Sequence, residues 1–505
     1  MKRNILTLLS SLLFILSSAQ TQDLYQLANG KYQGFNAIFD QDDNLYGYVA
    51  IYSYDASKEK RTKKFEYVIL DKNLNPVANK EFEGDITTES YFGFLDFRKN
   101  LILSPYVDEY AVKPKEFFYP RSMVVNLKDN TIKTKTYYDY KDGVFTEIPK
   151  PKTEKEEEKE RKKEKRTNGY IYHSYIYEIK EGGYLISEFD EYKDYVKNNS
   201  IIRFDENKKE LWRYRYNTNG DKKNQEWIKI LDKNDKYIYL FVSETHKKEK
   251  KFYLKVLDIK TGKIISDQPV DGQISKIIEY LGRTNRLGKK SFEDKTIYIL
   301  PNISEDDQHI GYVKATLDKK NFNIDFKPLS FLAFKNSLPN INANGKLEKG
   351  YYLLARDFFF LKDGSVGILF EKYKEPEYFS AAKTTDMVYV FTNPDFSVKG
   401  VKVLEKEKTV HYVDSDYLFY QYLNQGKDVV FFYRDLQKDK TTREKDWKLF
   451  INTLIKGNFK QEVIPISEKD NYFMVPYVAK EGYILLREYN EKEKYNKIRL
   501  ERLNY

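Results

Sequence analysis

The chain has 505 residues and a net charge of +10, which arises from 87 basic and 77 interspersed acidic residues, and it contains no cysteine. The lack of cysteine excludes disulfides, zinc-thiolate sites, a cysteine nucleophile and lipid attachment at a cysteine. The mild, mixed charge and the lack of a recognisable nucleic-acid-binding module argue against nucleic acid as a partner.

The N-terminus has the features of an export signal. Lys2 and Arg3 precede an apolar stretch, Ile5–Leu16, and small residues follow up to Ala19, before Gln20. This order of charge, apolar core and small residues is that of a secretory signal peptide. A stretch of twelve residues is too short for a bilayer that needs about twenty, which argues against the alternative of an uncleaved anchor. We therefore expect residues 1–19 to be removed and the product to be periplasmic or extracellular, without integral membrane insertion.

Residues 20–505 contain a repeated phrase that begins with a short apolar run. Eight such runs occur, and each is preceded or opened by Gly, Asn, Asp or Lys. They lie at Leu45–Ile51, Leu101–Leu103, Gly183–Ile186, Lys236–Val242, Lys295–Leu300, Gly364–Phe370, Val429–Tyr433 and Gly482–Leu486. A second run with alternating apolar residues follows each of them. These second runs lie at Phe65–Leu70, Met123–Leu127, Ser200–Phe204, Phe252–Leu257, His309–Leu317, Met387–Phe391, Trp447–Ile455 and Asn496–Leu500.

In six copies the second run ends in a turn signal. The turns begin at Asp71, Asn126, Asp205, Asp258, Asp318 and Asn393. Asp and Asn side chains accept hydrogen bonds from their own backbone two residues on, and Gly or Asn tolerates a positive φ, so these segments predict hairpin turns. A further strand-like run precedes most copies, at Tyr91–Phe97, Tyr172–Ile179, Trp227–Leu231, Asp357–Leu361, Tyr417–Leu423 and Tyr472–Val478.

Four strands per unit, repeated about every 55 to 60 residues, predict an all-β propeller of four-stranded antiparallel blades. Eight blades are expected, or seven if one faint copy is misread, and the copy at Lys276–Phe326 is the least regular. The 45 Tyr and 33 Phe suit strands with aromatic cross-strand pairs. Because the repeat covers nearly all of residues 20–505, we expect a single domain.

One segment interrupts the repeat. Fifteen of the seventeen residues in Lys150–Arg166 are charged, nine basic and six acidic. Such a segment cannot bury apolar surface, so we interpret residues 150–168 as a solvated insertion, either a loop or an exposed helix. A docking arm for a partner is the alternative.

The last copy ends after its third strand, at Tyr505. Propellers commonly close by letting one terminus complete the blade of the other, because unpaired strand edges invite aggregation. We therefore expect Leu24–Tyr32 to supply the missing outer strand of the last blade.

In the usual blade, the excursions between the second and third strands emerge on the same face as the connections between blades. In this chain they are long and polar, and they lie at Asp55–Lys64, Asp190–Asn199, Glu244–Lys251, Ser304–Gln308, Lys372–Asp386 and Asp435–Asp446. Tyrosines occur in or beside them, namely Tyr52, Tyr54, Tyr192, Tyr195, Tyr373 and Tyr378. Loops on a rigid scaffold often carry function, so this face is the predicted binding face. An envelope protein or a polysaccharide is the expected class of ligand.

Catalytic motifs are not evident. No two of the four histidines are close enough in sequence to bind a metal together from one strand or helix, since they lie at His173, His246, His309 and His411. His411 precedes Asp414–Asp416, which includes Ser415, and this permits a hydrolase interpretation, although a triad is defined by geometry. Asp363–Gly367 resembles a Gly-x-Ser-x-Gly elbow only loosely and predicts a hairpin turn. Nothing singles out two of the 77 acids as a glycosidase pair, so the catalytic residues are unknown.

Two short acidic segments offer oxygen ligands of the kind that calcium prefers. They are Asp40–Asn44 and Glu305–Asp307. The first lacks the Gly and the distal Glu of an EF-hand loop, and it is better explained as a turn between the first two strands of a blade. We discount the second in the same way and expect no metal and no cofactor.

Two phrases carry a resemblance. Gly-Gly-Tyr-Leu-Ile from Gly182 and Leu-Lys-Val-Leu-Asp-Ile-Lys-Thr-Gly-Lys-Ile-Ile from Leu254 resemble blades of secreted bacterial β-propellers, the second especially those of quinoprotein-type repeats. The chain departs from named classes, since it has no Trp-Asp pair and no Ser-x-Asp-x-Gly-x-Thr-Trp box. The resemblance implies a propeller with a binding or assembly role, and it does not imply quinone binding.

The sequence therefore predicts an exported, non-catalytic β-propeller that acts as a binding or scaffold protein of the bacterial cell envelope. Two alternatives stay open: a propeller hydrolase that acts on glycans or peptides, and an outer-membrane β-barrel. The ligand and the oligomeric state are left open as well.

Overall fold

The structure is a computed structural model that describes most of the chain beyond the N-terminal segment. The described residues are 21–40, 43–57, 62–85, 88–96, 98–105, 123–134, 138–141, 144–147, 170–172, 176–192, 195–218, 221, 223–247, 249–270, 288–304, 306, 308–376, 381–411, 415–438, 441–466 and 472–504. The expected signal peptide at 1–19 and the charged insertion at 150–168 lie outside these residues, so both stay predictions.

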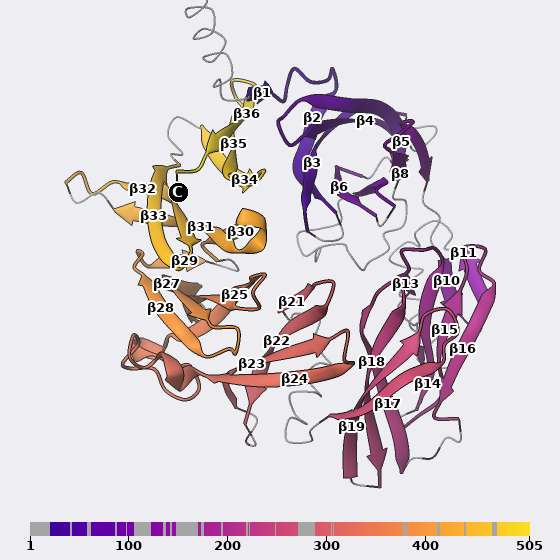
Figure 1. Ribbon diagram of the computed structural model, residues 1–505. Coiled ribbons are helices and arrows are strands. Elements are labelled where there is room, and N and C mark those ends of the chain that lie inside the picture. Colours follow the sequence, from indigo (N-terminus) through magenta and orange to yellow (C-terminus); the bar gives the residue numbers. More distant parts are fainter. Residues whose placement is uncertain are drawn as a thin grey trace, which may run out of the picture. The chain divides into compact units, whose positions relative to one another are not determined.

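The described residues form eight antiparallel blade sheets, six with four strands and two with an added fifth strand, and one separate two-stranded hairpin; their course along the sequence can be followed in Figure 1. Apart from the added strands and the sheet where the chain ends meet, the strands of each sheet follow one another in an up-and-down order. Within the described residues, helix is confined to short 3₁₀ turns, η2 (Phe331–Phe334), η3 (Glu348–Gly350) and η4 (Asn424–Gly426). The chain is thus an all-β, eight-bladed β-propeller in its described part, as the repeat predicted.

The blades fall into two compact units, and the first consists of residues 1–137 and 418–505. Its first two sheets are β2 (Lys31–Phe39), β3 (Leu45–Ser57), β4 (Thr62–Asp71) and β5 (Pro76–Asp85), and then β6 (Tyr91–Leu95), β7 (Leu101–Pro105), β8 (Met123–Asn126) and β9 (Thr131–Thr134). Its last two are β30 (Tyr417–Leu423), β31 (Asp428–Lys438), β32 (Lys445–Ile455) and β33 (Asn458–Pro465), and then β34 (Phe473–Val478), β35 (Tyr483–Asn490) and β36 (Tyr495–Arg502), joined by β1 (Thr21–Asp23).

The second unit consists of residues 138–417. It begins with a hairpin, β10 (Tyr138–Lys141) and β11 (Val144–Glu147), and its first blade has β12 (Tyr170–Tyr172), β13 (Ile176–Glu178), β14 (Tyr184–Tyr192), β15 (Tyr195–Phe204) and β16 (Glu210–Tyr216). The next blade has β17 (Asn224–Lys233), β18 (Tyr237–His246), β19 (Glu249–Asp258) and β20 (Ile264–Val270). The last two have β21 (Gly288–Ser291), β22 (Lys295–Ile303), β23 (His309–Asp318) and β24 (Asn323–Ser330), and then β25 (Tyr352–Phe360), β26 (Val366–Lys374), β27 (Ala382–Thr392) and β28 (Val398–Leu404), with β29 (Thr409–His411) beside β27.

The repeated apolar runs mark the second and third strands of each blade. The first runs lie in or overlap β3, β7, β14, β18, β22, β26, β31 and β35, and the second runs lie in or overlap β4, β8, β15, β19, β23, β27, β32 and β36. These middle strands are buried on both faces, as the six successive buried residues of β4 show. Outer strands such as β33 alternate between exposed and half-buried residues. Middle strands are therefore continuously apolar because a neighbouring blade covers each face.

Blades that are neighbours within a unit share their cores. In the first unit, Val49 and Tyr67 pack with Leu101 of the next blade, and Tyr48 packs with Leu485 of the last blade. In the second unit, Tyr239 packs in one cluster with Leu300, and Ile297 packs in another with Phe370. No blade could exclude water from its faces alone, so the blades stabilise one another by burial.

The N-terminal strand completes the last sheet, as expected, but different residues form it. Thr21–Asp23 pairs antiparallel with β36, and Figure 1 shows indigo β1 against yellow β36. The predicted segment, Leu24–Tyr32, is instead mostly the turn into β2, because the backbone N–H of Gln26 donates to the carbonyl of Asp23 at 3.0 Å. The side chain of Leu24 is fully buried and anchors this turn.

Most of the predicted turns form by the expected hydrogen bond. Asp71 accepts from the backbone N–H of Asn73 at 2.7 Å, and Asn126, Asp205, Asp258 and Asp318 accept equivalent bonds. The positive φ, however, falls on a residue other than Gly or Asn in four of the six turns, at Leu74 (67°), Lys208 (64°), Phe322 (55°) and Phe396 (69°). The side chains of Leu74 and Phe396 are buried, and their burial offsets the strain of the left-handed conformation.

The polar excursions were expected to be long loops, and several are instead extended hairpins. Tyr192 pairs with Tyr195 at the end of β14–β15, and His246 pairs with Glu249 at the end of β18–β19. Polar side chains do not stop backbone pairing, because water solvates both faces of a strand that projects beyond the core. Apolar periodicity therefore marked where the core ends and not where the strands end.

Candidate functional site

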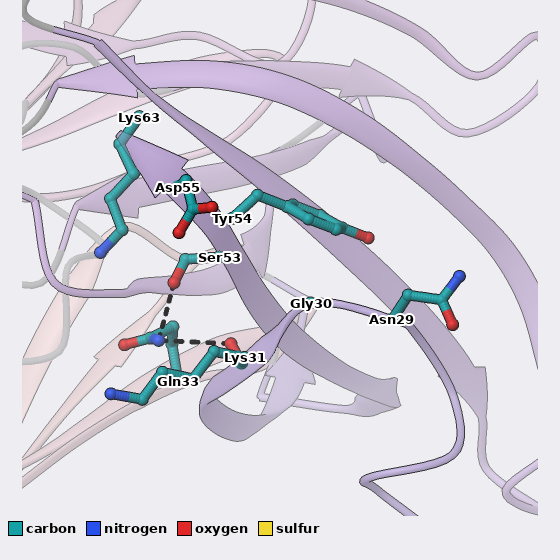
Figure 2. A pocket seen from close by; sticks show the side chains of 8 residues that line it. All are labelled: Asn29, Gly30, Lys31, Gln33, Ser53, Tyr54, Asp55 and Lys63. Atoms are coloured by element: carbon teal, nitrogen blue, oxygen red, sulfur yellow. Dashed lines mark hydrogen bonds between the residues drawn. The ribbon is translucent and has the colours of Figure 1, made fainter. Parts of the chain in front are cut away.

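An open cavity of about 470 Å³ lies in the β2–β5 blade, where β2 begins, β3 ends and β4 begins. Figure 2 shows the eight residues that line it, namely Asn29, Gly30, Lys31, Gln33, Ser53, Tyr54, Asp55 and Lys63. Its volume is within the usual range for small-molecule sites, about 300 to 1,000 Å³. It lies on the face where the excursion between the second and third strands emerges, as predicted for a binding face.

A β-bulge shapes the floor of this cavity. Tyr32 pairs with Tyr52 and Gly34 pairs with Ile51, so Gln33 is the extra residue of β2. Its amide nitrogen donates to the hydroxyl of Ser53 at 2.7 Å and to the carbonyl of Lys31 at 3.2 Å. Bulges re-aim side chains and are common next to functional sites.

Gly30 allows the chain to approach β3 closely. A Cβ at this position would lie 3.0 Å from Cβ of Tyr52 and 3.1 Å from both the carbonyl oxygen of Ser53 and Cε2 of Tyr54. A larger residue would push the turn before β2 away from β3. The small residue therefore sets the position of the cavity wall.

Tyr54 is held in place by its neighbours. Its hydroxyl donates to the carboxylate of Glu66, and the ammonium group of Lys64 lies 5.4 Å from the centre of its ring. Burial and the hydrogen bond to Glu66 raise the pKa of Tyr54 to about 12. The phenol is therefore neutral at physiological pH and serves as a fixed wall, not as an acid or base.

Three charged side chains line the cavity: Lys31, Asp55 and Lys63. Lys63 also places its ammonium group 5.2 Å from the ring centre of Phe65. Within the described residues, none of the three forms an ion pair, whereas the adjacent Lys64 pairs with Glu81. The lining thus has one net positive charge, which no carboxylate among the described residues neutralises.

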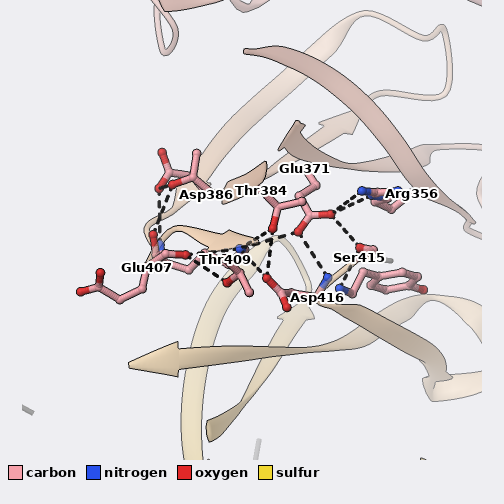
Figure 3. A network of polar contacts seen from close by, with 11 residues as sticks. Arg356, Glu371, Thr384, Asp386, Glu407, Thr409, Ser415 and Asp416 are labelled. Atoms are coloured by element: carbon pink, nitrogen blue, oxygen red, sulfur yellow. Dashed lines mark hydrogen bonds and ion pairs between the residues drawn. The ribbon is translucent and has the colours of Figure 1, made fainter. Parts of the chain in front are cut away.

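A second polar cluster lies in the β25–β28 blade and is shown in Figure 3. Glu371 of β26 is fully buried, and its carboxylate binds the guanidinium of Arg356 at 2.8 Å. The hydroxyl of Ser415 donates to the same carboxylate at 2.7 Å. Lys406, also buried, contacts Glu371 at 3.7 Å and Asp416 at 2.6 Å.

The four charged groups of this cluster balance one another, and the hydroxyl of Thr384 adds a hydrogen bond to Asp416 at 3.2 Å. Lys406 and Asp416 flank the connection that leaves β28, and the cluster fastens this connection to β25, β26 and β27. Because the carboxylates of Glu371 and Asp416 are buried and paired, the cluster has the features of a structural anchor.

The cavity and the polar cluster occupy equivalent places in their blades. Ala355 pairs with Phe370 and Asp357 pairs with Leu369, so Arg356 is the bulged residue of β25, as Gln33 is of β2. The side chain of Arg356 contacts Glu371, and the side chain of Gln33 contacts Ser53. Glu371 and Ser53 occupy the same register position on the second strands of their blades. In the β25–β28 blade the chain itself contributes Lys406 and Asp416 beside this pair, whereas in the β2–β5 blade the described residues leave an open cavity.

The predicted tyrosines have different fates. Tyr54 lines the cavity, but Tyr52 is fully buried and donates its hydroxyl to the carbonyl of Leu24, so it belongs to the core. The guanidinium of Arg356 lies over the ring of Tyr373, 5.4 Å from the ring centre. The side chains of Tyr192, Tyr195 and Tyr378 lie outside the described part of the structure.

The hydrolase interpretation relied on His411, Asp414, Ser415 and Asp416. The side chains of His411 and Asp414 are not among those described, and Ser415 donates its hydroxyl to Glu371.

His309 packs against the rings of Tyr312 and Phe331, each 5.0 Å away, and burial lowers its pKa. His173 is not described, and His246 is exposed at the end of β18. The loose elbow at Asp363–Gly367 forms the expected hairpin turn, in which Gly364 donates to the carbonyl of Leu361.

The first candidate metal loop is a turn. Asp40 accepts from the backbone N–H of Asn44 at 2.8 Å, as a turn requires, while Glu305 and Asp307 lie outside the described residues. Among the described side chains, no group of three or more His, Asp or Glu is placed to hold a metal ion. The described residues include no helix that is long and apolar enough to cross a membrane.

Sequence reasoning missed Gln33 and Ser53 of the cavity and Glu371 and Lys406 of the cluster. The only available signal was a polar residue at the end of an apolar run, as Ser53 and Glu371 are in their strands. A bulge leaves no such signal, because it depends on how two strands pair.

No protein-family model and no curated protein matches the chain. Similar solved structures include BamB from Moraxella catarrhalis, at 9% identity over 96% of this chain and 99% of that chain, with a TM-score of 0.33. They also include the Dos1 propeller, at 9% identity over 79% and 88% with a TM-score of 0.29. Prolyl oligopeptidase B from Galerina marginata aligns at 11% identity over 94% of this chain and 57% of its own, with a TM-score of 0.33. The blades themselves, and not these distant likenesses, define the chain as a β-propeller protein.

Proposed function

We propose that this protein is an exported, non-catalytic β-propeller that binds a polar ligand at the bacterial cell envelope. The observation that carries the proposal is the cavity of the β2–β5 blade, which has a polar lining. The bulge at Gln33 and the close approach of Gly30 to β3 shape it. Rigid scaffolds with such a cavity bind ligands through a few well-placed polar groups. The order of residues in 1–19 supports export to the periplasm or the outside of the cell.

A binding role fits the chemistry of the lining better than catalysis does. The side chains that line the cavity are amides, a hydroxyl, a phenol, two ammonium groups and a single carboxylate. Glycoside hydrolysis uses a pair of carboxylates, and acyl transfer uses a nucleophile beside a base. The lining as described offers hydrogen bonds and charge, which bind and orient a ligand.

The test is binding by the purified chain that begins at Gln20, measured on a glycan array and by capture of envelope proteins. Asn29→Trp places a bulky side chain at an exposed part of the cavity wall, and Asn458→Trp is the matched control at the exposed first residue of β33 in another blade. We expect Asn29→Trp to weaken binding by at least about tenfold, which is about 1.4 kcal/mol, and Asn458→Trp to leave it unchanged. Turnover of a bound glycan or peptide, or binding that ignores Asn29→Trp, would contradict the proposal.

A further inference from the structure

We propose that the cavity of the β2–β5 blade recognises an acidic saccharide, with Lys31 and Lys63 binding its anionic group. This inference rests on the proposed binding function and specifies the ligand class of the same cavity. Four features carry it: the unpaired charges, the directed hydrogen-bonding groups, the scarcity of apolar lining, and the contrast with the equivalent place in the β25–β28 blade.

The charged groups of the cavity lack the carboxylate partners that several lysines of this molecule have. Elsewhere in the described residues, four buried or largely buried lysines lie beside carboxylates, with Lys255 at 2.9 Å from Glu244, Lys319 at 3.0 Å from Asp232, Lys372 at 2.8 Å from Asp386 and Lys406 at 2.6 Å from Asp416. A fifth buried lysine, Lys314, instead donates to the backbone carbonyls of Gly364 and Pro394. Lys31 and Lys63 have no carboxylate within ion-pair distance among the described residues, although both face one cavity. Against the single carboxylate of Asp55, these two ammonium groups leave one net positive charge in the described lining, which an anionic group of a ligand can neutralise.

The uncharged groups are directed. Gln33 uses its amide nitrogen on Ser53 and Lys31, so its carbonyl oxygen is left to accept a hydrogen bond. Ser53 accepts from Gln33, and its own hydroxyl hydrogen is left to donate. A sugar hydroxyl both donates and accepts, so one hydroxyl can bind each of these groups. The lining thus matches a ligand that has several hydroxyls beside one anionic group.

A saccharide fits this cavity better than a peptide. Peptide and protein interfaces depend on a few buried aromatic or apolar anchors that fill apolar pockets. Here Tyr54 is the one aromatic residue of the lining, and Glu66, Lys64 and Gly30 already hold its ring in place. No apolar pocket is therefore offered, whereas hydrogen-bonding groups cover most of the wall.

The β25–β28 blade shows how this place is filled from within the chain. There the bulged residue is Arg356 and its partner is Glu371, and Lys406 and Asp416 complete a neutral cluster. In the β2–β5 blade, neutral Gln33 and Ser53 replace the ion pair, and the lysines stand at the rim of an open volume. In the β25–β28 blade, the chain itself supplies the charges that balance the cluster. In the β2–β5 blade, the described residues supply no such partner, and we assign that part to the ligand.

The experiment uses the purified chain from Gln20 and an array of saccharides in matched pairs, each acidic sugar beside its neutral counterpart, followed by calorimetric titration of the best pair. We expect the acidic member to bind at least about tenfold more tightly than the neutral one, the scale of a hydrogen bond to a charged group. Lys31→Gln and Lys63→Gln should each weaken binding of the acidic member about five- to tenfold. The matched control is Lys399→Gln, an exposed lysine of β28, which should change nothing. Affinity should also fall as salt is added.

The outcomes separate this inference from the proposed function. Equal binding of both members, or full affinity after both lysines are changed, would overturn the acidic saccharide and leave a binding protein with a neutral ligand. Binding of poly-glutamate that depends on both lysines, with no saccharide bound, would replace the saccharide with an acidic peptide. No binding to any probe, together with turnover of one of them, would overturn both proposals. Unchanged thermal unfolding of each variant shows that a lost affinity is not lost folding.

Discussion

Asp232 lies between two blades and is almost completely buried. Lys319 contacts its carboxylate at 3.0 Å and Lys289 at 3.5 Å, and the hydroxyl of Ser291 donates at 3.0 Å. Burial alone would raise the pKa of Asp232, but the two lysines and the hydrogen bonds outweigh it and lower the pKa to about 2. Its ionised form therefore stabilises the contact between the β17–β20 and β21–β24 blades.

The lowered pKa predicts a dependence of stability on pH. The ionised carboxylate contributes its stabilisation above the unfolded pKa of about 4, and this is lost as the pH falls towards 2. We expect Asp232→Asn to reduce the free energy of unfolding by roughly 2 kcal/mol at pH 7, with the difference from the unaltered protein shrinking between pH 4 and pH 2. Urea unfolding at a series of pH values measures this. A difference in the free energy of unfolding that does not vary with pH would show that Asp232 stabilises the fold by packing and not by its charge.

The buried cluster around Glu371 predicts a larger effect. Lys406→Met would leave Asp416 and Glu371 buried with fewer cations, and we expect a loss of about 3 to 5 kcal/mol in the free energy of unfolding. Lys399→Met, on an exposed position of β28, should stay within about 0.5 kcal/mol. Combining Lys406→Met with Asp416→Leu should recover part of the loss, because the unpaired charge disappears. If Lys406→Met lowered the free energy of unfolding as little as Lys399→Met does, the cluster would not stabilise the fold.

Single residues also show where sequence reasoning reaches its limit. Tyr52 and Tyr54 are two positions apart, and both were candidates for ligand contact. The structure buries Tyr52 against Leu24 and places Tyr54 in the cavity wall. Which aromatic residue is core and which is cavity depends on the turn packed beside them, and that turn follows from the pairing of β1 with β36.

At the scale of elements, the three-residue strand β1 completes the last blade. Its three residues pair with Lys497–Arg499 and cover the edge of β36, and the backbone N–H of Leu24 donates to Asn496 at 2.8 Å. Apolar periodicity could not locate it, because Thr-Gln-Asp carries no such signal. The need to cover an edge predicted that a strand would come from the N-terminus, but the choice of residues depended on where the following turn fits.

Removal of β1 should therefore destabilise the last blade. We expect a chain that begins at Leu24 to lose about 1 to 4 kcal/mol in the free energy of unfolding relative to one that begins at Gln20, since about three ladder hydrogen bonds are lost. It should also aggregate more readily, because the edge of β36 becomes exposed. Thermal unfolding and light scattering of the two chains measure these effects. Identical behaviour would mean that the pairing of β1 with β36 does not stabilise the fold.

At the scale of the whole molecule, export and folding meet at the N-terminus. Cleavage after Ala19 would leave Gln20 as the first residue, directly before β1, so the strand that completes the last blade would be retained. We predict that mass spectrometry of the mature protein finds Gln20 at the N-terminus, and that fractionation without detergent recovers the protein in the periplasm or the medium.

A pair of substitutions tests the cleavage site. Ala19→Arg replaces the small residue next to the expected cut, and the precursor should accumulate several-fold, while Ser18→Gln at the more tolerant neighbouring position should still be processed. Processing is read from the mass of the product. Normal processing of both variants, or a first residue beyond Asp23, would contradict the predicted site and the retention of β1.

The amino-acid sequence by itself determined the class of fold, because that class follows from local periodicity repeated along the chain. Apolar runs such as Leu45–Ile51 and turns such as the one at Asp71 need no distant partner to be identified. The tertiary structure alone decided the bulges at Gln33 and Arg356, the closing strand and the cavity. These depend on which register gives the best burial between strands and blades, a property of many contacts together that no single segment encodes.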